Sequence, residues 1–495
     1  MYESITAFST RFISWIPMEF LFLLAAGCLG FRLYSFVRWK YVGNQLPGPP
    51  SDMWFGNLRE IKQYAGFFDY LPSMHKQYGK IFRFWMGPTN LIVSINDQEI
   101  LAETVPLLHQ RPETARKELG WLGKESPTFK CHEELREIRT TIMPLLVGKS
   151  LDYLCLVGRG RMEKMLDNWA ISPHGIRAED VLRDTTFDII GVTLFGQEFI
   201  STSLGRSFRS LFVEVMREAH PRSQEIIPAV WDYRYWRWKQ KIRKLHSCAE
   251  ELIKQRRCSS KTSKRKDLLS LLLNEKDENR ELLFSDEQAR ATIVTFVFAG
   301  FDTSAASLTW ILYLLATHTD AQRKAQREID CILAGRPPQL EDLASMSYLT
   351  CVVKEGLRMY PPVPEALRKI DFDIQREKYF IPNGATLVIP ISTLHADAEN
   401  WEKPYSFVPE RFDSMHERKQ PRYSYLPFGA GPKSCMGARF AMTEIRLMLS
   451  MILQRFSVEL APNQDVVPEM YSIILQPKYG LKINVIPRKA DMMNV

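Results

Sequence analysis

The 495-residue sequence has no CxxC pair, because its eight cysteines are scattered along the chain. This absence disfavours a zinc ribbon or a disulfide scaffold, and reduced cytosolic surroundings fit best. No Gly/Ser-rich linker, low-complexity block or internal repeat divides the chain, so any domain boundary must come from motifs. The net charge of +8 is modest for this length and indicates no nucleic-acid partner. With 45% hydrophobic residues, the chain can bury a large core.

Phosphate-binding motifs are also incomplete in the glycine-rich stretch PFGAGPKSCMG, residues 427–437. A P-loop needs glycine directly before Lys-Ser, whereas Pro432 intervenes here, and the third glycine of a dinucleotide fingerprint is missing. The glycines that are present allow close backbone approach to a flat, bulky group. Cys435 is then either a buried core thiol or a single thiolate ligand to a metal carried by a cofactor, with Lys433 offering positive charge.

The N-terminal apolar run, residues 16–36, is long enough as a helix to cross a hydrocarbon core of about 30 Å. Basic residues lie near its end and after it, and only Arg11 precedes it. This asymmetry predicts an uncleaved membrane anchor with the rest of the chain in the cytoplasm. A cleaved signal peptide, or a lipoprotein signal acylated at Cys28, would need basic residues first. The stiff segment LPGPP then separates an anchor and linker, 1–45, from a domain spanning 46–495.

The cysteine loop carries a more specific pattern. Its spacing, Phe428-Gly429-x-Gly431-x-Lys433-x-Cys435-x-Gly437, resembles the haem-binding loop of the cytochrome P-450 monooxygenases. KEGLRMYPPVP carries the family's ExxR pattern, and FVPERF lies between it and the loop, as in the family. The resemblance covers residues 46 to about 487. It implies a mainly α fold, in which a large helical domain with small β-sheets surrounds a buried haem b. Cys435 would be the axial ligand of the haem iron, beside the cofactor-binding residues Phe428, Gly429 and Gly437.

Glu355 and Arg358 form the ExxR pair, and Arg411 belongs to FVPERF. Taken alone, a Glu and an Arg at i, i+3 are commonly a solvated pair on a helix surface. The resemblance implies instead that Glu355, Arg358 and Arg411 form a buried ion network behind the haem. Their role would be structural, because loss of one partner would leave a buried charge unpaired and release the cysteine loop.

Residues 284–318 form an almost wholly apolar run that begins with a capping box, Ser285 with Gln288, and predicts a buried helix. Asp302 and Thr303 interrupt this run, and an acid beside a hydroxyl costs free energy there unless it is used or paired. From the residues alone two interpretations stay open. Thr303 bonds back to a carbonyl one turn earlier while Asp302 is capped by a neighbouring cation, or both groups take part in chemistry.

The sequence AGFDT, residues 299–303, is similar to the distal-helix motif of the cytochrome P-450s. The resemblance implies that the helix opens over the haem at Ala299 and Gly300, and that Asp302 and Thr303 are catalytic residues that relay protons. This pair favours monooxygenation over the hydroperoxide rearrangements of members that need neither protons nor electrons. Alanine at 299 excludes the ester to haem that long-chain fatty acid hydroxylases often form through a glutamate.

Three cations are candidates to bind the haem propionates. Arg139 matches the arginine of the family's WxxxR motif, although Leu135 stands where the tryptophan belongs, which removes an N–H donor worth about 1 kcal/mol. Arg368 resembles a second propionate ligand. Lys433 replaces an arginine, and a lysine orients a carboxylate less firmly than a planar guanidinium does. The alternative for these arginines is a surface cation.

The segments expected to contact substrate are largely apolar and aromatic, which indicates a lipophilic molecule. These segments are 114–129, 217–233, the helix face around Phe296 and Phe298, and 363–367. Cations expected to dock an acidic reductase are Arg439 and those of the tracts 235–244 and 256–266.

The function implied is insertion of one oxygen atom from O2 into a fatty acid, sterol, terpenoid or xenobiotic. Only a haem domain follows the anchor, so electrons from NADPH should arrive through a separate NADPH-cytochrome reductase, with cytochrome b5 as a second donor. We expect a single-pass protein of the endoplasmic reticulum membrane whose catalytic domain faces the cytoplasm. The alternatives are a same-fold peroxide isomerase or dehydratase that needs no reductase, and a non-catalytic haem-binding protein.

Overall fold

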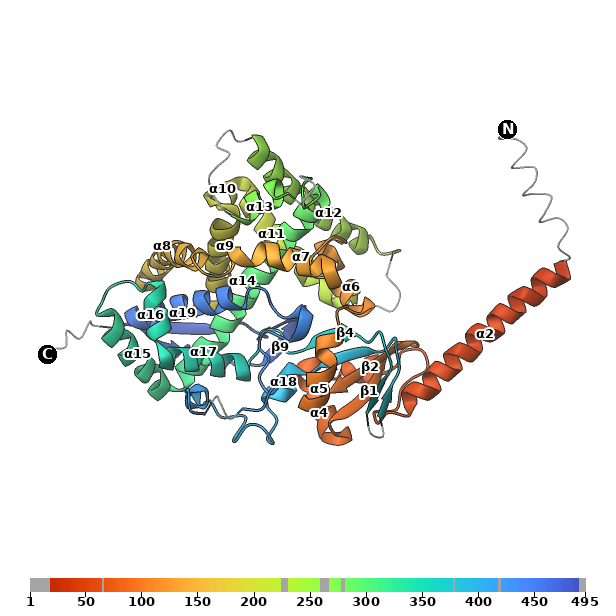
Figure 1. Ribbon diagram of the computed structural model, residues 1–495. Coiled ribbons are helices and arrows are strands. Elements are labelled where there is room, and N and C mark those ends of the chain that lie inside the picture. Colours follow the sequence, from red (N-terminus) through yellow and green to blue (C-terminus); the bar gives the residue numbers. More distant parts are fainter. Residues whose placement is uncertain are drawn as a thin grey trace.

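The computed structural model describes residues 18–64, 66–223, 230–258, 267–276, 281–376, 379–416 and 420–488. Within these residues the chain is mainly helical, with four small sheets (Figure 1). The helices are α2 (Met18–Asn44), α3 (Leu58–Ile61), α4 (Phe67–Tyr78), α5 (Gln98–Thr104), α6 (Glu113–Leu119), α7 (His132–Ile142), α8 (Ser150–Ile171), α9 (Ala178–Phe195), α10 (Gln197–Ser201), α11 (Ser203–Ser223), α12 (Tyr233–Cys258), α13 (Leu268–Asn274), α14 (Asp286–Thr317), α15 (Thr319–Leu333), α16 (Leu340–Ser345), α17 (Ser347–Met359), α18 (Ile391–His395) and α19 (Ala438–Arg455). The strands are β1 (Ile81–Met86), β2 (Asn90–Ile95), β3 (Ile176–Arg177), β4 (Ala366–Lys369), β5 (Ile374–Arg376), β6 (Tyr379–Ile381), β7 (Thr386–Ile389), β8 (Phe456–Leu460), β9 (Pro468–Tyr471), β10 (Ile474–Pro477) and β11 (Lys482–Pro487).

The largest sheet has the strand order β1-β2-β7-β4 and joins segments that lie almost 300 residues apart in the sequence. Strands β2 and β7 are parallel, with Ile92 opposite Thr386, whereas β4 and β7 are antiparallel. The four residues of β7 are all buried, as expected for a central strand with both faces covered. On β4, Arg368 lies opposite Leu387 and is 1% exposed. The sheet therefore carries a cation into the protein interior.

Helix α14 crosses the middle of the helical body in Figure 1, and its sequence explains why it is buried. Ser285 and Gln288 form the predicted capping box, and nearly all side chains from Ala289 to Leu315 are buried. Helix α9 packs against α14 at Gly300, where an added Cβ would lie only 2.6 Å from the Cδ1 atom of Ile190. A glycine at this position allows the two helix backbones to approach closely.

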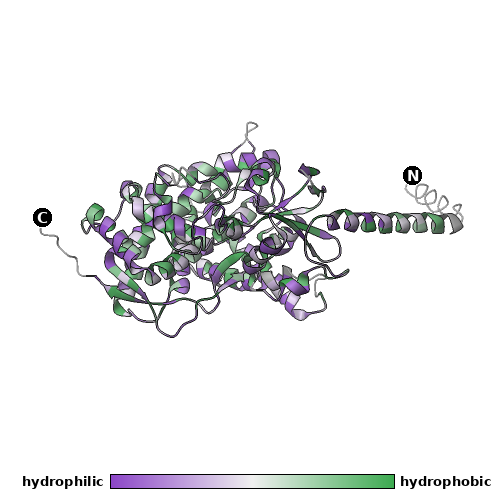
Figure 2. Cartoon of the chain, turned by 90° about the horizontal axis from the view of Figure 1, so that it is seen from below, coloured by the Kyte–Doolittle hydropathy of each residue, from purple (hydrophilic) through white to green (hydrophobic). Residues whose placement is uncertain are grey.

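Helix α2 stands out from the folded body as a single rod (Figures 1 and 2). Its hydrophobic side chains are largely exposed, with Phe22 at 78% and Leu29 at 71%. Only its C-terminal end touches the body, where Trp39 packs edge-on against Trp85 of β1 with ring centroids 6.4 Å apart. The first two residues of the predicted anchor, 16 and 17, lie outside the described residues, and the helix continues beyond the predicted end to Asn44.

Among the described residues, α14 is long and apolar enough to cross a membrane. The bent pair formed by α7 and α8 would be a second candidate if the two helices were counted as one span. Most of α14 is buried inside the protein, so its apolar character is explained by the core. The proline-rich segment after α2 is bound to the first sheet, because the N–H of Arg83 on β1 donates to the carbonyl of Pro47 over 2.7 Å. This contact ties the exit of α2 to the first sheet.

Candidate active site

The cysteine loop runs between the sheet and α19, and two of its glycines take backbone conformations that favour glycine. The backbone N–H of Cys435 donates to the carbonyl of Phe428 over 2.9 Å, which closes the loop. Gly429 and Gly431 have φ of +67° and +70°. A Cβ on Gly431 would lie 2.7 Å from the carbonyl oxygen of Val105, so the loop can approach the 105–107 turn only with glycine there.

The Cys435 thiol lies deep in the protein, yet it is open to interior space rather than packed as a core side chain. Burial raises the pKa of this thiol, while the N–H of Gly437 and the charge of Arg139 act in the opposite direction. The Gly437 N–H belongs to the start of α19, whose positive dipole end favours a thiolate. The thiol therefore has the access and the donor contacts of a metal ligand, whereas an inert core thiol would have no open space beside it.

Arg139 and Arg368 both hold the backbone of the cysteine loop. Arg139, on α7, donates from Nη1 to the carbonyl of Ser434 over 2.7 Å. Arg368, on β4, donates from Nη2 to the carbonyl of Ala430 over 3.1 Å, and its Nε is buried without a partner. Leu135 lies one turn before Arg139 and is 5% exposed, so the tryptophan position of the family is filled by a packed aliphatic side chain.

Lys433 points from the loop toward the chain that precedes α7. Its ammonium donates to the carbonyl of Thr128 over 3.2 Å and also to the carbonyl of Lys130. Burial, and the charges of Arg111 and Arg368, lower the pKa of Lys433 to about 7. Two of its three N–H groups are thus used by backbone carbonyls, which leaves one for a further acceptor.

Arg111 is a fourth cation at this place, and the sequence analysis did not predict it. The carbonyl of the preceding residue, Gln110, accepts a hydrogen bond of 2.9 Å from the N–H of Lys369, which brings Arg111 beside the end of β4. Its Nε is buried without a partner among the described residues. A single arginine before a proline carries no motif, so only the pairing of this loop with β4 could reveal it.

The four cations form what we call the cation cluster: Arg111, Arg139, Arg368 and Lys433. In the part of the chain that the structure describes, no acidic side chain forms an ion pair with any of them. Burying like charges together without an acid costs free energy, so an anionic group is needed to compensate them. A flat cofactor with two carboxylates beside a Cys435 ligand, which is the donor set of haem b, fits this arrangement.

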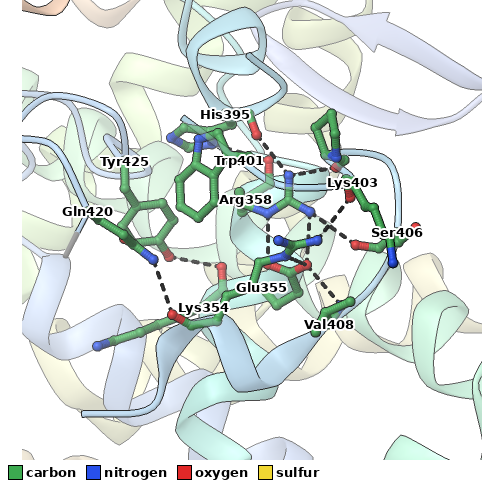
Figure 3. Close-up of polar contacts among 12 residues, drawn as sticks. Lys354, Glu355, Arg358, His395, Trp401, Lys403, Ser406, Val408, Gln420 and Tyr425 are labelled. Atoms are coloured by element: carbon green, nitrogen blue, oxygen red, sulfur yellow. Dashed lines mark hydrogen bonds and ion pairs between the residues drawn. The ribbon is translucent and has the colours of Figure 1, made fainter. Parts of the chain in front are cut away.

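The predicted ion network is present and buried (Figure 3). Arg358 donates from Nε and Nη2 to the two carboxylate oxygens of Glu355 over 2.7 and 2.8 Å, and both residues are at most 1% exposed. Arg411 adds a contact of 3.3 Å from its Nε to Glu355, and the N–H of Val408 donates to the same carboxylate over 3.0 Å. Arg358 also donates to the carbonyls of His395, Pro404 and Ser406. The network therefore fixes two backbone segments, at residue 395 and at 404–408, and pairs the buried Glu355 carboxylate with two arginines.

His395 connects this network to the cysteine loop, and no sequence motif indicated it. Its Nε2 accepts the N–H of Leu426 over 2.8 Å, so its Nδ1 carries the proton and donates to the carbonyl of Arg358 over 3.1 Å. Burial, and then the charge of Arg358, lower the pKa of His395 to about 3. The neutral His395 ring thus joins α17 to the start of the loop that carries Cys435, through one hydrogen bond to each.

Ala299 and Thr303 lie one turn apart on the same face of α14, and both are partly exposed although the residues around them are buried. Open space therefore lies beside this face of the helix. The Thr303 hydroxyl donates to the carbonyl of Ala299 over 2.7 Å, which is the first of the two interpretations left open above. The opening of the helix at Ala299 and Gly300 is not seen, because α14 runs unbroken through this motif.

Asp302 points away from the face that carries Thr303. Its Oδ1 accepts from Nε of Arg183 over 2.8 Å and from Gln476 over 3.3 Å, and its Oδ2 is buried without a partner among the described residues. The carboxylate borders a cavity of about 310 Å³ between α9, α11, β9 and β10, also lined by Tyr471. The structure thus brings Cys435, Arg139, Arg368 and Lys433 together but places Asp302 on another side of α14 from Thr303.

Comparisons with known proteins agree on one family. Residues 46–485 match the family model described as Cytochrome P450. The chain is 28% identical over 467 residues to Cytochrome P450 3A31 of Mesocricetus auratus, covering 90% of this chain and 92% of the relative. It is 28% identical to Lithocholate 6-beta-hydroxylase of the same species (92% and 93% covered), and 30% identical to Cytochrome P450 3A2 of Rattus norvegicus (90% and 92% covered). A crystal structure of the cytochrome P450DA heme domain has a similar fold, with a TM-score of 0.80, 23% identity, and coverage of 90% of this chain and 98% of that chain.

Proposed function

Because the chain belongs to the cytochrome P450 family and is a monooxygenase with haem b as its cofactor, we propose that it oxidises a lipophilic substrate with electrons passed from NADPH by a separate reductase. The observation that supports this most directly is the accessible Cys435 thiol beside four cations, one buried and three half-buried, that lack acidic partners among the described residues. With a thiolate ligand, haem b activates O2 with two electrons and two protons, so that one oxygen atom enters a C–H or C=C bond and the other leaves as water.

Different residues of the chain would bind the haem iron, bind the propionates and hold the cysteine loop in place. Cys435 supplies the iron ligand, and Arg139, Arg368, Lys433 and Arg111 supply donors for the two propionates. Gly429 and Gly431 give the loop its shape, while Phe428 and Gly437 lie on either side of the ligand position. Glu355, Arg358 and Arg411 keep the loop backbone in place from behind.

Thr303 is the group that we propose to position a proton donor over the oxygen site. Its hydroxyl lies on the open face of α14 with Ala299, and the hydrogen bond to the Ala299 carbonyl leaves the oxygen lone pairs free to accept from water. Asp302 would supply protons from the cavity on the other side of the helix, where Arg183 holds its carboxylate. Relay from Asp302 to Thr303 then needs water or a change of the Asp302 rotamer, because the two side chains point in different directions.

Membrane attachment is also part of the proposal, with residues 1–45 as a single-pass anchor and linker in the endoplasmic reticulum membrane and 46–495 as the catalytic domain in the cytoplasm. The exposed hydrophobic side chains of α2 support it, since only the C-terminal end of this helix contacts the body and the apolar side chains before that end need an apolar environment. Arg439, exposed at the start of α19 next to the cysteine loop, is the docking cation that we favour for the acidic face of the reductase.

The tract 235–244 lies on α12, where Lys241 is already paired with Glu214 and Glu218. Of the second basic tract, residues 259–266 lie outside the described residues. Among the candidate docking cations, Arg439 is therefore the best position at which to test reductase binding. Arg439→Glu should weaken reductase-supported turnover while leaving the haem spectrum unchanged.

The test of the proposed function is the absorption spectrum of the reduced, CO-bound protein. A Soret band near 450 nm, about 30 nm beyond that of a neutral axial ligand, is expected, and Cys435→Ser should abolish it. A band at the shorter wavelength in folded wild-type protein would refute thiolate ligation.

Turnover then separates the candidate functions. Product formed from O2, NADPH and reductase supports the monooxygenase. Product formed from a peroxide substrate alone would support the isomerase or dehydratase instead. Turnover by neither route, in protein with the long-wavelength band, would support a non-catalytic haem protein.

A further inference from the structure

Glu444 is a fully buried acid that has no role in the site described above. It lies on α19, the helix that begins directly after the cysteine loop, and its side chain is 0% exposed. Among the described residues, neither of its carboxyl oxygens forms a hydrogen bond. A carboxyl group without a partner costs free energy in the core, and it costs far more when it is ionised. An acid at this position is therefore expensive unless it serves the reaction.

The acid lies where α19 meets α14. The two helices contact each other, and the hydroxyl of Ser304 on α14 is close enough to Glu444 to lower the pKa of the acid. Ser304 is 2% exposed and directly follows Thr303, the residue whose hydroxyl lies on the open face of α14. The contact between Glu444 and Ser304 therefore joins the helix that carries Thr303 to the helix that follows the Cys435 loop.

Burial keeps Glu444 neutral at pH 7, because it raises the pKa of the acid to about 8 against the opposite effect of Ser304. In the part of the chain that the structure describes, no charged group on the elements packed most closely against α19, which are α8, α14, α15, α16, α17 and β8, shifts this pKa. Asp302 of α14 is turned toward α9. Cys155 of α8 and Arg446 of α19 act on each other instead. An ionised Glu444 would thus be a buried charge without a cation to compensate it.

We propose that Glu444 is a positioning residue: as a neutral acid it lets α14 pack closely on α19 and so holds Thr303 over the oxygen site. This inference rests on the proposed function and adds a residue that acts through Thr303. An ionised carboxylate needs donors that the closed contact lacks, so water enters between the helices and α14 moves. A displacement of about 1 Å can lower the rate of a positioned reaction by about 100-fold. O2 then takes up two electrons and two protons and leaves as hydrogen peroxide, without oxidising the substrate.

The first experiment measures coupling, the product formed per NADPH consumed, in the full-length enzyme with reductase between about pH 6.5 and pH 9. Wild-type coupling should fall at least about threefold as the pH rises through about 8, with peroxide replacing product. Glu444→Gln cannot ionise, so its coupling should lack this fall, whereas the exposed control Glu163→Gln should follow the wild type. Ser304→Ala removes the hydroxyl that lowers the pKa of Glu444, so it should move the midpoint upward by about 0.5–1 pH unit.

Infrared difference spectra test the protonation state without turnover. At pH 7 the spectrum of the wild type minus that of Glu444→Gln should contain the C=O stretching band of a protonated carboxyl group, and the band should disappear with a midpoint near pH 8. Absence of this band at pH 7 would overturn the proposal. Coincident coupling profiles of the wild type and Glu444→Gln would overturn it as well.

A second variant keeps the test decisive if Glu444→Gln does not retain the band near 450 nm. The coupling midpoint of Ser304→Ala then decides, and a midpoint equal to that of the wild type would overturn the proposal. Failure of this inference is distinct from failure of the proposed function, because product formed at pH 7 from O2, NADPH and reductase shows monooxygenase activity whatever the pH profiles are.

Discussion

Acidification should weaken the fold through His395, because this neutral ring joins the ion network to the cysteine loop. The folded-state pKa of His395 is lowered to about 3, whereas the ring in an unfolded chain titrates at about 6.5. Between these values the unfolded state binds more protons than the folded state, so stability is present above about pH 6.5 and is lost as the pH falls. One pKa unit corresponds to about 1.36 kcal/mol. Protonation linked to His395 alone should therefore lower the free energy of unfolding by about 2.5 kcal/mol between pH 7 and pH 4.5.

Two buried acids act in the opposite direction over the same pH range. Burial raises the pKa of Glu365 and of Glu444, each to about 8, so the folded state holds more of their protons between about pH 4.5 and pH 8. Their contribution to stability is largest at low pH and is lost as the pH rises through the folded-state value. The total pH dependence is therefore a sum of opposing effects, and only a difference between two variants isolates His395.

The assay is urea unfolding of the full-length protein at a series of pH values, for the wild type and His395→Gln. Glutamine can still accept the Leu426 N–H, but it does not titrate and does not reach the Arg358 carbonyl at the same time. At neutral pH the variant should be less stable by about 1–3 kcal/mol, and this deficit should shrink by about 2.5 kcal/mol at pH 4.5. Parallel stability curves would refute the reasoning, and the exposed control His174→Gln should follow the wild type.

Three further outcomes are expected. Arg358→Lys cannot reproduce the forked contacts to Glu355 and three carbonyls, so it should lose at least about 3 kcal/mol and fail to develop the band near 450 nm. Gly431→Ala should cost about 3 kcal/mol in urea unfolding and Gly429→Ala only about 1, because both have positive φ but only the first collides with a carbonyl; equal losses would contradict this. Thr303→Ala should keep the spectrum while diverting NADPH electrons to peroxide, and Thr303→Ser should restore coupling; full coupling in the alanine variant would remove Thr303 from the mechanism.

Local patterns predicted much of the site because they were decided by short-range physics. The capping box at Ser285 needs only four consecutive residues, and the apolar run after it could be stable only if buried. The i, i+3 spacing predicted that Glu355 and Arg358 share one helix face. That the pair is buried was predicted only from the resemblance to the family. The sequence also left open the return bond from Thr303 to Ala299, and the structure contains it.

The remaining contacts depend on chain segments that only the tertiary fold brings together. Arg111 joins the cation cluster because a loop pairs with β4 more than 250 residues later, and His395 is fixed by partners 31 and 37 residues away. The side chain of Asp302 points toward α9 because Arg183, on that helix, forms an ion pair with its carboxylate. None of these contacts has a spacing rule, so no periodicity could reveal them.

The cation cluster makes haem insertion a folding event as well as the loading of a catalyst. In an unfolded chain Arg111, Arg139, Arg368 and Lys433 are separated and hydrated, whereas folding gathers them where their repulsion is poorly screened. The propionates act as the counter-ions that this part of the core lacks, so cofactor affinity and fold stability are linked. Neutralising one of these cations should therefore have opposite effects on two forms of the protein: the haem-free chain becomes easier to fold, and the haem-bound enzyme becomes easier to empty.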